Sequence, residues 1–272
     1  MFSGKNPGCS GMETGRKRMN QVYVWHDTEK NIFTRKDGKN QKEKKLVFDD
    51  RYREIGEEAL KNNIRITEAE FGKTLKIIGK KSFLNCTALR KITLEKAEKI
   101  YGGAFGGCVN LKEIYFPPAF EYLGKRAFCE CKRLKKIQFD KDSSITAIPD
   151  QAFYRCGNLT EITFPQNLKS IGKESFCQTG IQNLELPDSL RIIDNNAFAK
   201  CSHLESVIIP QSVKWIGSSA FRGCNRLKTI EIHGDVQKIG EQIANRNVII
   251  RCKEGSSVDE YCRQNGYITE YA

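Results

Sequence analysis

The chain has no long hydrophobic run and contains little histidine. No stretch of its 272 residues approaches the ~18 consecutive apolar residues that identify a membrane-spanning helix, which excludes a helical membrane protein. The three histidines, His26, His203 and His233, have no serine or cysteine nucleophile in a strained turn beside them, and the acidic residues form no paired arrangement. We therefore predict that the protein is not an enzyme and assign no catalytic residue.

A secretory signal is also missing. Residues 1–20 are rich in Gly, Ser, Lys and Arg but have no apolar core, so no signal peptide is recognisable. We expect a flexible basic leader here, with Met19 as an alternative start that would make the leader non-native. The missing signal favours a cytoplasmic location.

The 11 cysteines do not have the spacing of a metal centre. The only close pairs, Cys129-x-Cys131 and Cys201-x-His203, lack a second half at zinc-site spacing. We therefore predict no metal and no cofactor.

The prominent feature that the chain does have is a repeat. Seven phenylalanines return at intervals of 22 to 25 residues, and a cysteine follows six of them three positions later, with Thr179 in the remaining place. These phenylalanines are Phe83, Phe105, Phe128, Phe153, Phe176, Phe198 and Phe221. Such a period means that one small unit is stacked repeatedly, and units of about 20–29 residues are typical of a leucine-rich-repeat solenoid. We predict short parallel strands and turns, about 23 residues per coil, with the rings stacked in one spine.

Each unit contains a strand signal followed by turn residues. One unit reads Leu204-Glu-Ser-Val207-Ile-Ile209-Pro210, then Val213-Lys-Trp-Ile216-Gly217, then Ala220-Phe221. The alternation of apolar and mostly polar residues in its first block predicts a strand with one buried face, which the proline ends. We expect the glycine after isoleucine to occupy a turn with positive φ. This glycine recurs at Gly79, Gly124, Gly172, Gly217 and Gly240.

Six cysteines share one equivalent position per coil, so stacking places them in a ladder. Parallel side chains about 4.8 Å apart have poor disulfide geometry, and we interpret these cysteines as small buried hydrophobic residues with a weak donor. Cys252 and Cys262, on either side of a turn, are better placed to form a bridge, although free thiols are favoured there too.

The repeated run Cys-x-x-Leu-x-x-Ile-x-(Leu/Phe)-Pro, followed by Ile-Gly-x-x-Ala-Phe-x-x-Cys, resembles the BspA-like subclass of leucine-rich repeats over residues 51–252. The segment after Cys252 is similar to the C-terminal cap of that family, a glycine-serine turn leading into a short helix. A helix over 257–265 agrees with Ser256 or Ser257 as N-cap and Gly266 after its end. The resemblance implies attachment or adhesion at cell surfaces, with a surface or secreted location as the alternative to the cytoplasm.

We divide the chain into a leader (1–20), an N-terminal hairpin-like cap or loop (21–50), the solenoid (51–252) and the C-terminal cap (253–272). Within the second part, 22–25 and 32–34 are candidates for the two hairpin strands, and 35–45 is expected to be a solvated loop. We expect a monomer.

Outward positions of the strands are the candidate binding surface. Charges alternate along Lys91, Glu113, Lys136 and Glu161, which we interpret as a ladder that sets strand register rather than as a binding site. Four apolar residues stand out at other outward positions because aromatic and branched groups are typical of contact surfaces. They are Tyr115, Ile208, Tyr122 and Trp215, and burial against a neighbouring loop would explain Trp215 equally well.

A basic stretch offers a second candidate surface. The stretch 125–136, together with Lys112, carries a strong excess of positive charge, and the chain as a whole has a net charge of +12. The candidate residues are Lys112, Arg126, Lys132, Arg133, Lys135 and Lys136. No nucleic-acid-binding fold signature accompanies them, so a solvated rim is the simpler interpretation.

The leading functional hypothesis is a non-enzymatic scaffold that recognises a protein or other macromolecule through the solenoid surface. The alternative is an intracellular module that binds an acidic protein or nucleic acid through the rim at 125–136. A third possibility is an accessory repeat segment of a longer polypeptide.

Overall fold

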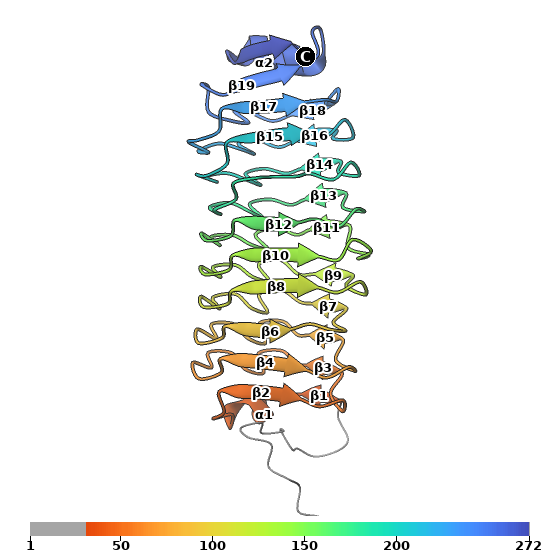
Figure 1. The fold of residues 1–272 in the computed structure, drawn as a ribbon, viewed down its shortest axis with the longest axis vertical. Helices are drawn as coiled ribbons and strands as arrows, with labels where there is room; N and C mark the ends of the chain where they lie inside the picture. The colour runs from red at the N-terminus through yellow and green to blue at the C-terminus, as the bar shows by residue number, and fades with distance from the viewer. Residues whose placement is uncertain (1–30, 272) are drawn as a thin grey trace, which may run out of the picture.

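The computed structural model describes residues 31–271, which form a straight rod of stacked coils (Figure 1). Every strand pair in this range is parallel, and each coil stacks on its sequence neighbours. The strands form two columns. The longer strands are β2 (Lys45–Phe48), β4 (Glu68–Phe71), β6 (Lys91–Thr93), β8 (Glu113–Phe116), β10 (Lys136–Phe139), β12 (Glu161–Thr163), β15 (Ser206–Ile209), β17 (Thr229–Ile232), β19 (Ile249–Cys252) and β20 (Ile268–Tyr271).

The second column consists of two-residue strands. They are β1 (Ile32–Phe33), β3 (Glu54–Ile55), β5 (Ile77–Ile78), β7 (Lys99–Ile100), β9 (Tyr122–Leu123), β11 (Ala147–Ile148), β13 (Ser170–Ile171), β14 (Ile192–Ile193), β16 (Trp215–Ile216) and β18 (Lys238–Ile239). Two short helices complete the described structure, α1 (Arg35–Lys39) and α2 (Ser257–Asn265). The leucine-rich-repeat solenoid predicted from the period is therefore confirmed.

The core is a spine of stacked phenylalanine rings. From Phe83 to Phe221, consecutive rings lie 5.1 to 5.6 Å apart between centroids, with planes within 16° of each other. All seven rings have no exposed surface. A single coil could not bury its own ring, so each ring gains its neighbours only from stacking.

The cysteine ladder lies beside this spine and contributes hydrogen bonds. The thiol of Cys108 donates to the carbonyl oxygen of Phe83 in the preceding coil at 3.2 Å, and Cys131 donates to Phe105 in the same way. Thr179, which replaces a cysteine, donates to the carbonyl oxygen of Phe176 in its own coil at 2.9 Å. All ten cysteines in the described range are buried free thiols, so Cys252 and Cys262 form no bridge there.

The glycine after isoleucine is needed for a reason that differs from the prediction. Gly124 does not have a positive φ. A positive φ is found instead at Arg126, two residues after Gly124 (φ 59), and at Lys81, two residues after Gly79 (φ 55). A Cβ on Gly124 would lie 2.3 Å from the backbone nitrogen of Gly102 in the preceding coil. The prediction of positive φ is therefore wrong: glycine is required because two backbones approach closely.

Both ends of the described rod extend the stack. β1 pairs with β3 as a parallel neighbour, and α1 and the start of β2 occupy the range 35–45 where we expected a solvated loop. The other expected hairpin strand, 22–25, lies outside the described residues. At the opposite end, α2 spans 257–265 as predicted. Ser256 is its N-cap, accepting from the Asp259 amide, and Gly266 follows it with φ 68.

Each departure from the 23-residue spacing coincides with a break in one strand column. The column of longer strands is interrupted after β6 and again between β12 and β15, and the coils there span 22 residues between phenylalanines. The short column is interrupted between β9 and β11, where the interval is 25 residues. One residue fewer or two residues more than the usual 23 shifts the backbone out of ladder register, so the spacing indicates where the sheets are discontinuous.

Candidate binding site

The break between β12 and β15 is the larger of the two in the long column. Residues 181–187 form no strand, and no backbone hydrogen bond joins them to β12 or β15. The residue lost from this coil lies in the turn before the strand position, because only Gly180 lies between Thr179 and Ile181, whereas two residues lie between Cys201 and Leu204. At the break after β6, the missing residue lies after the strand. β6 therefore still forms, and the Lys112 amide donates to the Arg90 carbonyl at 3.3 Å.

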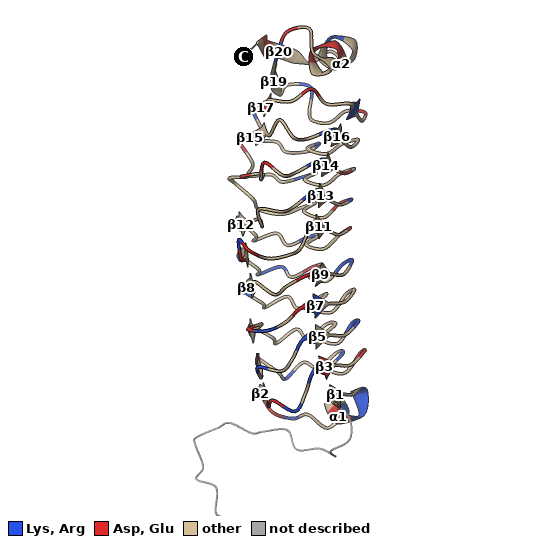
Figure 2. Ribbon diagram, turned by 90° about the vertical axis from the view of Figure 1, so that its right-hand side faces the viewer, with Lys and Arg blue, Asp and Glu red and all other residues tan. Residues whose placement is uncertain are grey.

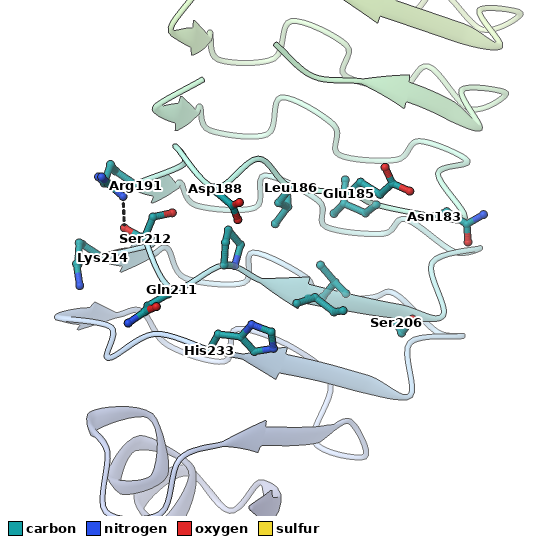
Figure 3. Close-up of a pocket in the computed structure, with 14 residues that line it drawn as sticks. Asn183, Glu185, Leu186, Asp188, Arg191, Ser206, Gln211, Ser212, Lys214 and His233 are labelled. Carbon is teal, nitrogen blue, oxygen red and sulfur yellow. Dashed lines mark hydrogen bonds between the residues drawn. The ribbon is translucent and has the colours of Figure 1, made fainter. Parts of the chain in front are cut away.

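A hollow of about 1160 Å³ opens at this break, between 183–188 and 206–212 (Figure 3). Apolar groups of Leu184, Leu186 and Ile208 line it together with polar and charged side chains. The core is also looser here, since Leu186 is only partly buried although the equivalent Ile209 is fully buried.

The edge of β15 faces this hollow with unused hydrogen-bonding groups. The carbonyls of Glu205 and Ile209 accept from the amides of Lys228 and His233, so the backbone groups of the odd-numbered residues along β15 point toward β17. Successive peptide groups of a strand point to alternate sides, and those of Ser206 and Ile208 therefore point to the opposite side. The next residues on that side, 183–186, make no backbone hydrogen bond to them.

Charges of both signs border the hollow. Arg191 and Lys214 lie at one end, beyond the carboxyl end of β15, and the Arg191 guanidinium donates to the carbonyl oxygen of Ser212 at 3.1 Å (Figure 3). Asp188 and Glu185 lie nearer the middle and the opposite end. The site can therefore contact a partner of mixed charge.

The apolar candidates from the sequence do not gather at one place. Ile208 is 54% exposed on β15 in the hollow, whereas Tyr115 is 47% exposed on β8. The Tyr115 hydroxyl donates to the Asp140 carboxylate at 2.7 Å, which raises the pKa of Tyr115. Trp215 and Tyr122 lie in the short-strand column, and the Lys238 ammonium lies 5.3 Å from the Trp215 ring centroid.

The basic candidates are also separated by the path of the coil. Arg126 lies in the turn before the spine residue Phe128, whereas Lys132 and Arg133 lie in the turn that leads to β10. Lys136 is the first residue of that strand and Lys135 directly precedes it, and Lys112 comes just before β8. Lys136 stands between Glu113 and Glu161 in register, and its ammonium lies 3.6 Å from the Glu161 carboxylate, as the register ladder predicts. Charges of both signs are interspersed along the rod (Figure 2).

Between residues 31 and 271, no group of three His, Cys, Asp or Glu side chains could hold a metal ion. No helix in that range has the length and apolar character needed to cross a membrane.

The repeat pattern is shared with a known family. The model of the BspA type leucine rich repeat region, in six copies, matches residues 38–146 and 123–250. The chain belongs to this family. The BspA-type repeat pattern thus accounts for most of the rod.

Solved structures of bacterial proteins share the fold. A leucine-rich repeat protein from Bacteroides ovatus is 21% identical, with a TM-score of 0.55 and a match that covers 85% of this chain and 84% of that chain. A leucine-rich repeat protein from Eubacterium ventriosum is 18% identical, with a TM-score of 0.50 and coverage of 80% and 68%. No curated protein matches the sequence significantly.

The sequence prediction identified Ile208 but not the hollow around it. Arg191, Lys214 and the peptide edge of β15 were not recognised as a site. The signal was present in the shortened Thr179-Gly180-Ile181 turn, which marks the coil that loses its strand.

Proposed function

We propose that this protein is a non-enzymatic interaction scaffold that binds a partner protein at the hollow beside β15. The observation that carries the proposal is the unpaired edge of β15 next to an exposed isoleucine. An extended segment of a partner would satisfy the peptide groups of Ser206 and Ile208 by adding a strand. Its side chains would cover Ile208 and meet the charges of Arg191 and Lys214.

The stacked architecture supports such a role. Its interior is filled by the phenylalanine spine, and stacking with nearest neighbours keeps the outer surface rigid without help from a ligand. A rigid surface loses little conformational entropy when it binds. Attachment to another macromolecule, the role that the family resemblance implies, needs a surface of this kind.

A random dodecapeptide display library tests the proposal without knowledge of the natural partner. Peptides selected on the wild-type protein should bind the Ile208→Glu variant at least ~10-fold more weakly, because a carboxylate would be buried against apolar groups. Tyr115→Glu is the matched control on β8, and it should retain binding. Two derivatives of a selected peptide should be compared, one methylated at its odd-numbered and one at its even-numbered backbone nitrogens. Only one of the two should bind more weakly, because only one set of amides faces β15.

Two results would contradict the proposal. In one, selection yields no peptide that distinguishes the wild type from Ile208→Glu. In the other, both parities of backbone methylation leave binding unchanged, which would show that no strand is added.

A further inference from the structure

A second hollow, of about 480 Å³, lies on a different face of the rod, in the turns around Phe105. The coil at its centre reads Gly102-Gly103-Ala-Phe-Gly106-Gly107, so four outward positions have no side chain. Neighbouring coils carry Lys80, Lys81, Leu84 and Asn85 at the corresponding positions on one side, and Lys125, Arg126, Cys129 and Glu130 on the other. The glycines leave a recess between two rows of larger side chains.

The recess is positively charged. Lys81 and Arg126 have the same left-handed backbone conformation as Gly103 between them, with φ of 55°, 59° and 65°, so they occupy equivalent positions one coil to either side of it. That places their backbones about 10 Å apart, across the glycine coil.

Neighbouring acids do not neutralise the two inner cations. Among the described residues, neither Lys81 nor Arg126 has a carboxylate oxygen within ion-pair distance. Glu58, at the position equivalent to Lys81 in the preceding coil, is paired with Lys61 at 2.6 Å and with Arg35 at 3.1 Å. Glu130, the acid in the lining of the recess, lies 3.8 Å from Arg155 in the following coil.

The two outer cations have only exposed partners. Lys125 lies 2.7 Å from Asp150, and Lys80 lies 3.5 Å from Glu57. Exposed ion pairs of this kind contribute little and exchange readily with a ligand. The recess therefore retains positive charge for an anionic group such as a sulfate ester.

A smaller hollow of about 280 Å³ is lined by Tyr101, the residue directly before Gly102 of the recess, so consecutive residues line the two hollows. Tyr101 and Tyr122 line it, with ring centroids 5.3 Å apart and exposed fractions of 39% and 45%. Glu121 also lines it, paired with Lys99 at 3.1 Å. Phenol rings with hydroxyl tips and a carboxylate suit neutral hydroxyl-bearing rings, because the ring faces cover C–H surface and the oxygens accept hydrogen bonds.

We propose that this double hollow binds a sulfated saccharide, with a sulfate group in the glycine recess and an uncharged part of the sugar on Tyr101 and Tyr122. Within residues 31–271, the Lys99–Glu121 pair leaves no unpaired cation beside the tyrosines, which favours this ligand over a nucleic acid, because a nucleic acid carries a phosphate on every residue and would bring one to this neutral hollow. A saccharide with sulfate groups on some positions only can place neutral hydroxyl groups there instead.

The test is a titration of the full chain with a κ-carrageenan tetrasaccharide, in which sulfated and uncharged residues alternate, at about 0.15 M salt, where long-range attraction is screened. The double variant Lys81→Glu and Arg126→Glu should bind at least ~10-fold more weakly. Glutamate fits this left-handed position, because Glu58 and Glu174 occupy it in other coils. Lys173→Glu with Lys200→Glu, on the turns of later coils, makes the same change in net charge and should change affinity less than ~3-fold.

A charge-neutral variant separates shape from charge. A Cβ on Gly102 would meet only the Lys125 carbonyl oxygen, at 3.3 Å, so Gly102→Gln should fold and fill the recess. We expect it to weaken tetrasaccharide binding ~5-fold or more, and Tyr122→Ala to do the same, with unchanged thermal unfolding.

Three outcomes would overturn the proposal: equal losses in the two double-charge variants, equally tight binding of a desulfated tetrasaccharide, or tighter binding of an oligothymidylate of similar length. The first would indicate non-specific attraction to net charge, and the third a nucleic-acid site. None of these outcomes bears on the hollow beside β15, because the peptide test does not involve these residues.

Discussion

Replacing Gly124 by alanine tests the close approach of neighbouring coils most directly. The new Cβ would lie 2.3 Å from the Gly102 nitrogen and 2.6 Å from the Tyr101 carbonyl carbon, and both are backbone atoms that cannot rotate away. Ordinary van der Waals contact requires the two coils to separate locally by about 1 Å.

This separation would break hydrogen bonds between the coils. The Gly124 amide donates to the Ile100 carbonyl at 2.7 Å, the Gly103 amide to Lys125 at 3.0 Å, and the Phe105 amide to Ala127 at 2.8 Å. Lengthened by about 1 Å, all three would exceed hydrogen-bonding distance. At about 1 kcal/mol each, their loss should lower the free energy of unfolding by roughly 3 kcal/mol.

The assay is urea denaturation followed by circular dichroism, and Gly157→Ala is the matched control. A Cβ on Gly157 meets nothing within 4 Å, and its φ is not in the left-handed region, so alanine there should be neutral or stabilising by up to about 1 kcal/mol. A loss below about 1 kcal/mol for Gly124→Ala would refute the steric reasoning, because the overlap would then be relieved without breaking the ladder.

Two further predictions concern the core. Phe153→Ala removes a fully buried ring stacked 5.6 and 5.3 Å from its neighbours, and should lower the free energy of unfolding, measured by thermal unfolding, by about 3–5 kcal/mol. The adjacent Tyr154→Ala should lower it by under about 1 kcal/mol. Equal losses would contradict a stabilising role of the stacked rings. Burial raises the pKa of Cys86 to about 12 and that of Cys108 well above its ordinary value. Unfolded thiols ionise near pH 8.5, so stability should fall as pH rises from about 8.5 toward 12, by up to ~1.4 kcal/mol per pH unit per thiol. Urea titrations at several pH values should show a shallower fall for Cys108→Ala, and an unchanged slope would show that Cys108 does not stay protonated in the native state.

The sequence alone determined the architecture because the repeat is a property of spacing. Equivalent residues 22 to 25 positions apart must lie over one another once the coils stack, so the spine of phenylalanines, the cysteine ladder and the Lys136–Glu161 register followed directly. The cap helix followed as well, because Ser256 and Gly266 satisfy its ends through local hydrogen bonds and backbone conformation.

The tertiary structure decided how neighbouring coils meet. The role of Gly124 depends on the distance to another coil, which spacing within one unit does not reveal. Residues 125–136 are consecutive in sequence but follow the coil around the rod, so their basic side chains are separated. Lys81 and Arg126 are distant in sequence but line the same recess, on either side of the glycine coil. The hollow beside β15 arises because one missing residue breaks a ladder that both neighbours depend on. A repeat predicts which residues align, whereas the candidate site beside β15 lies where the strand ladder is interrupted, and only the packed coils show which groups that interruption leaves exposed.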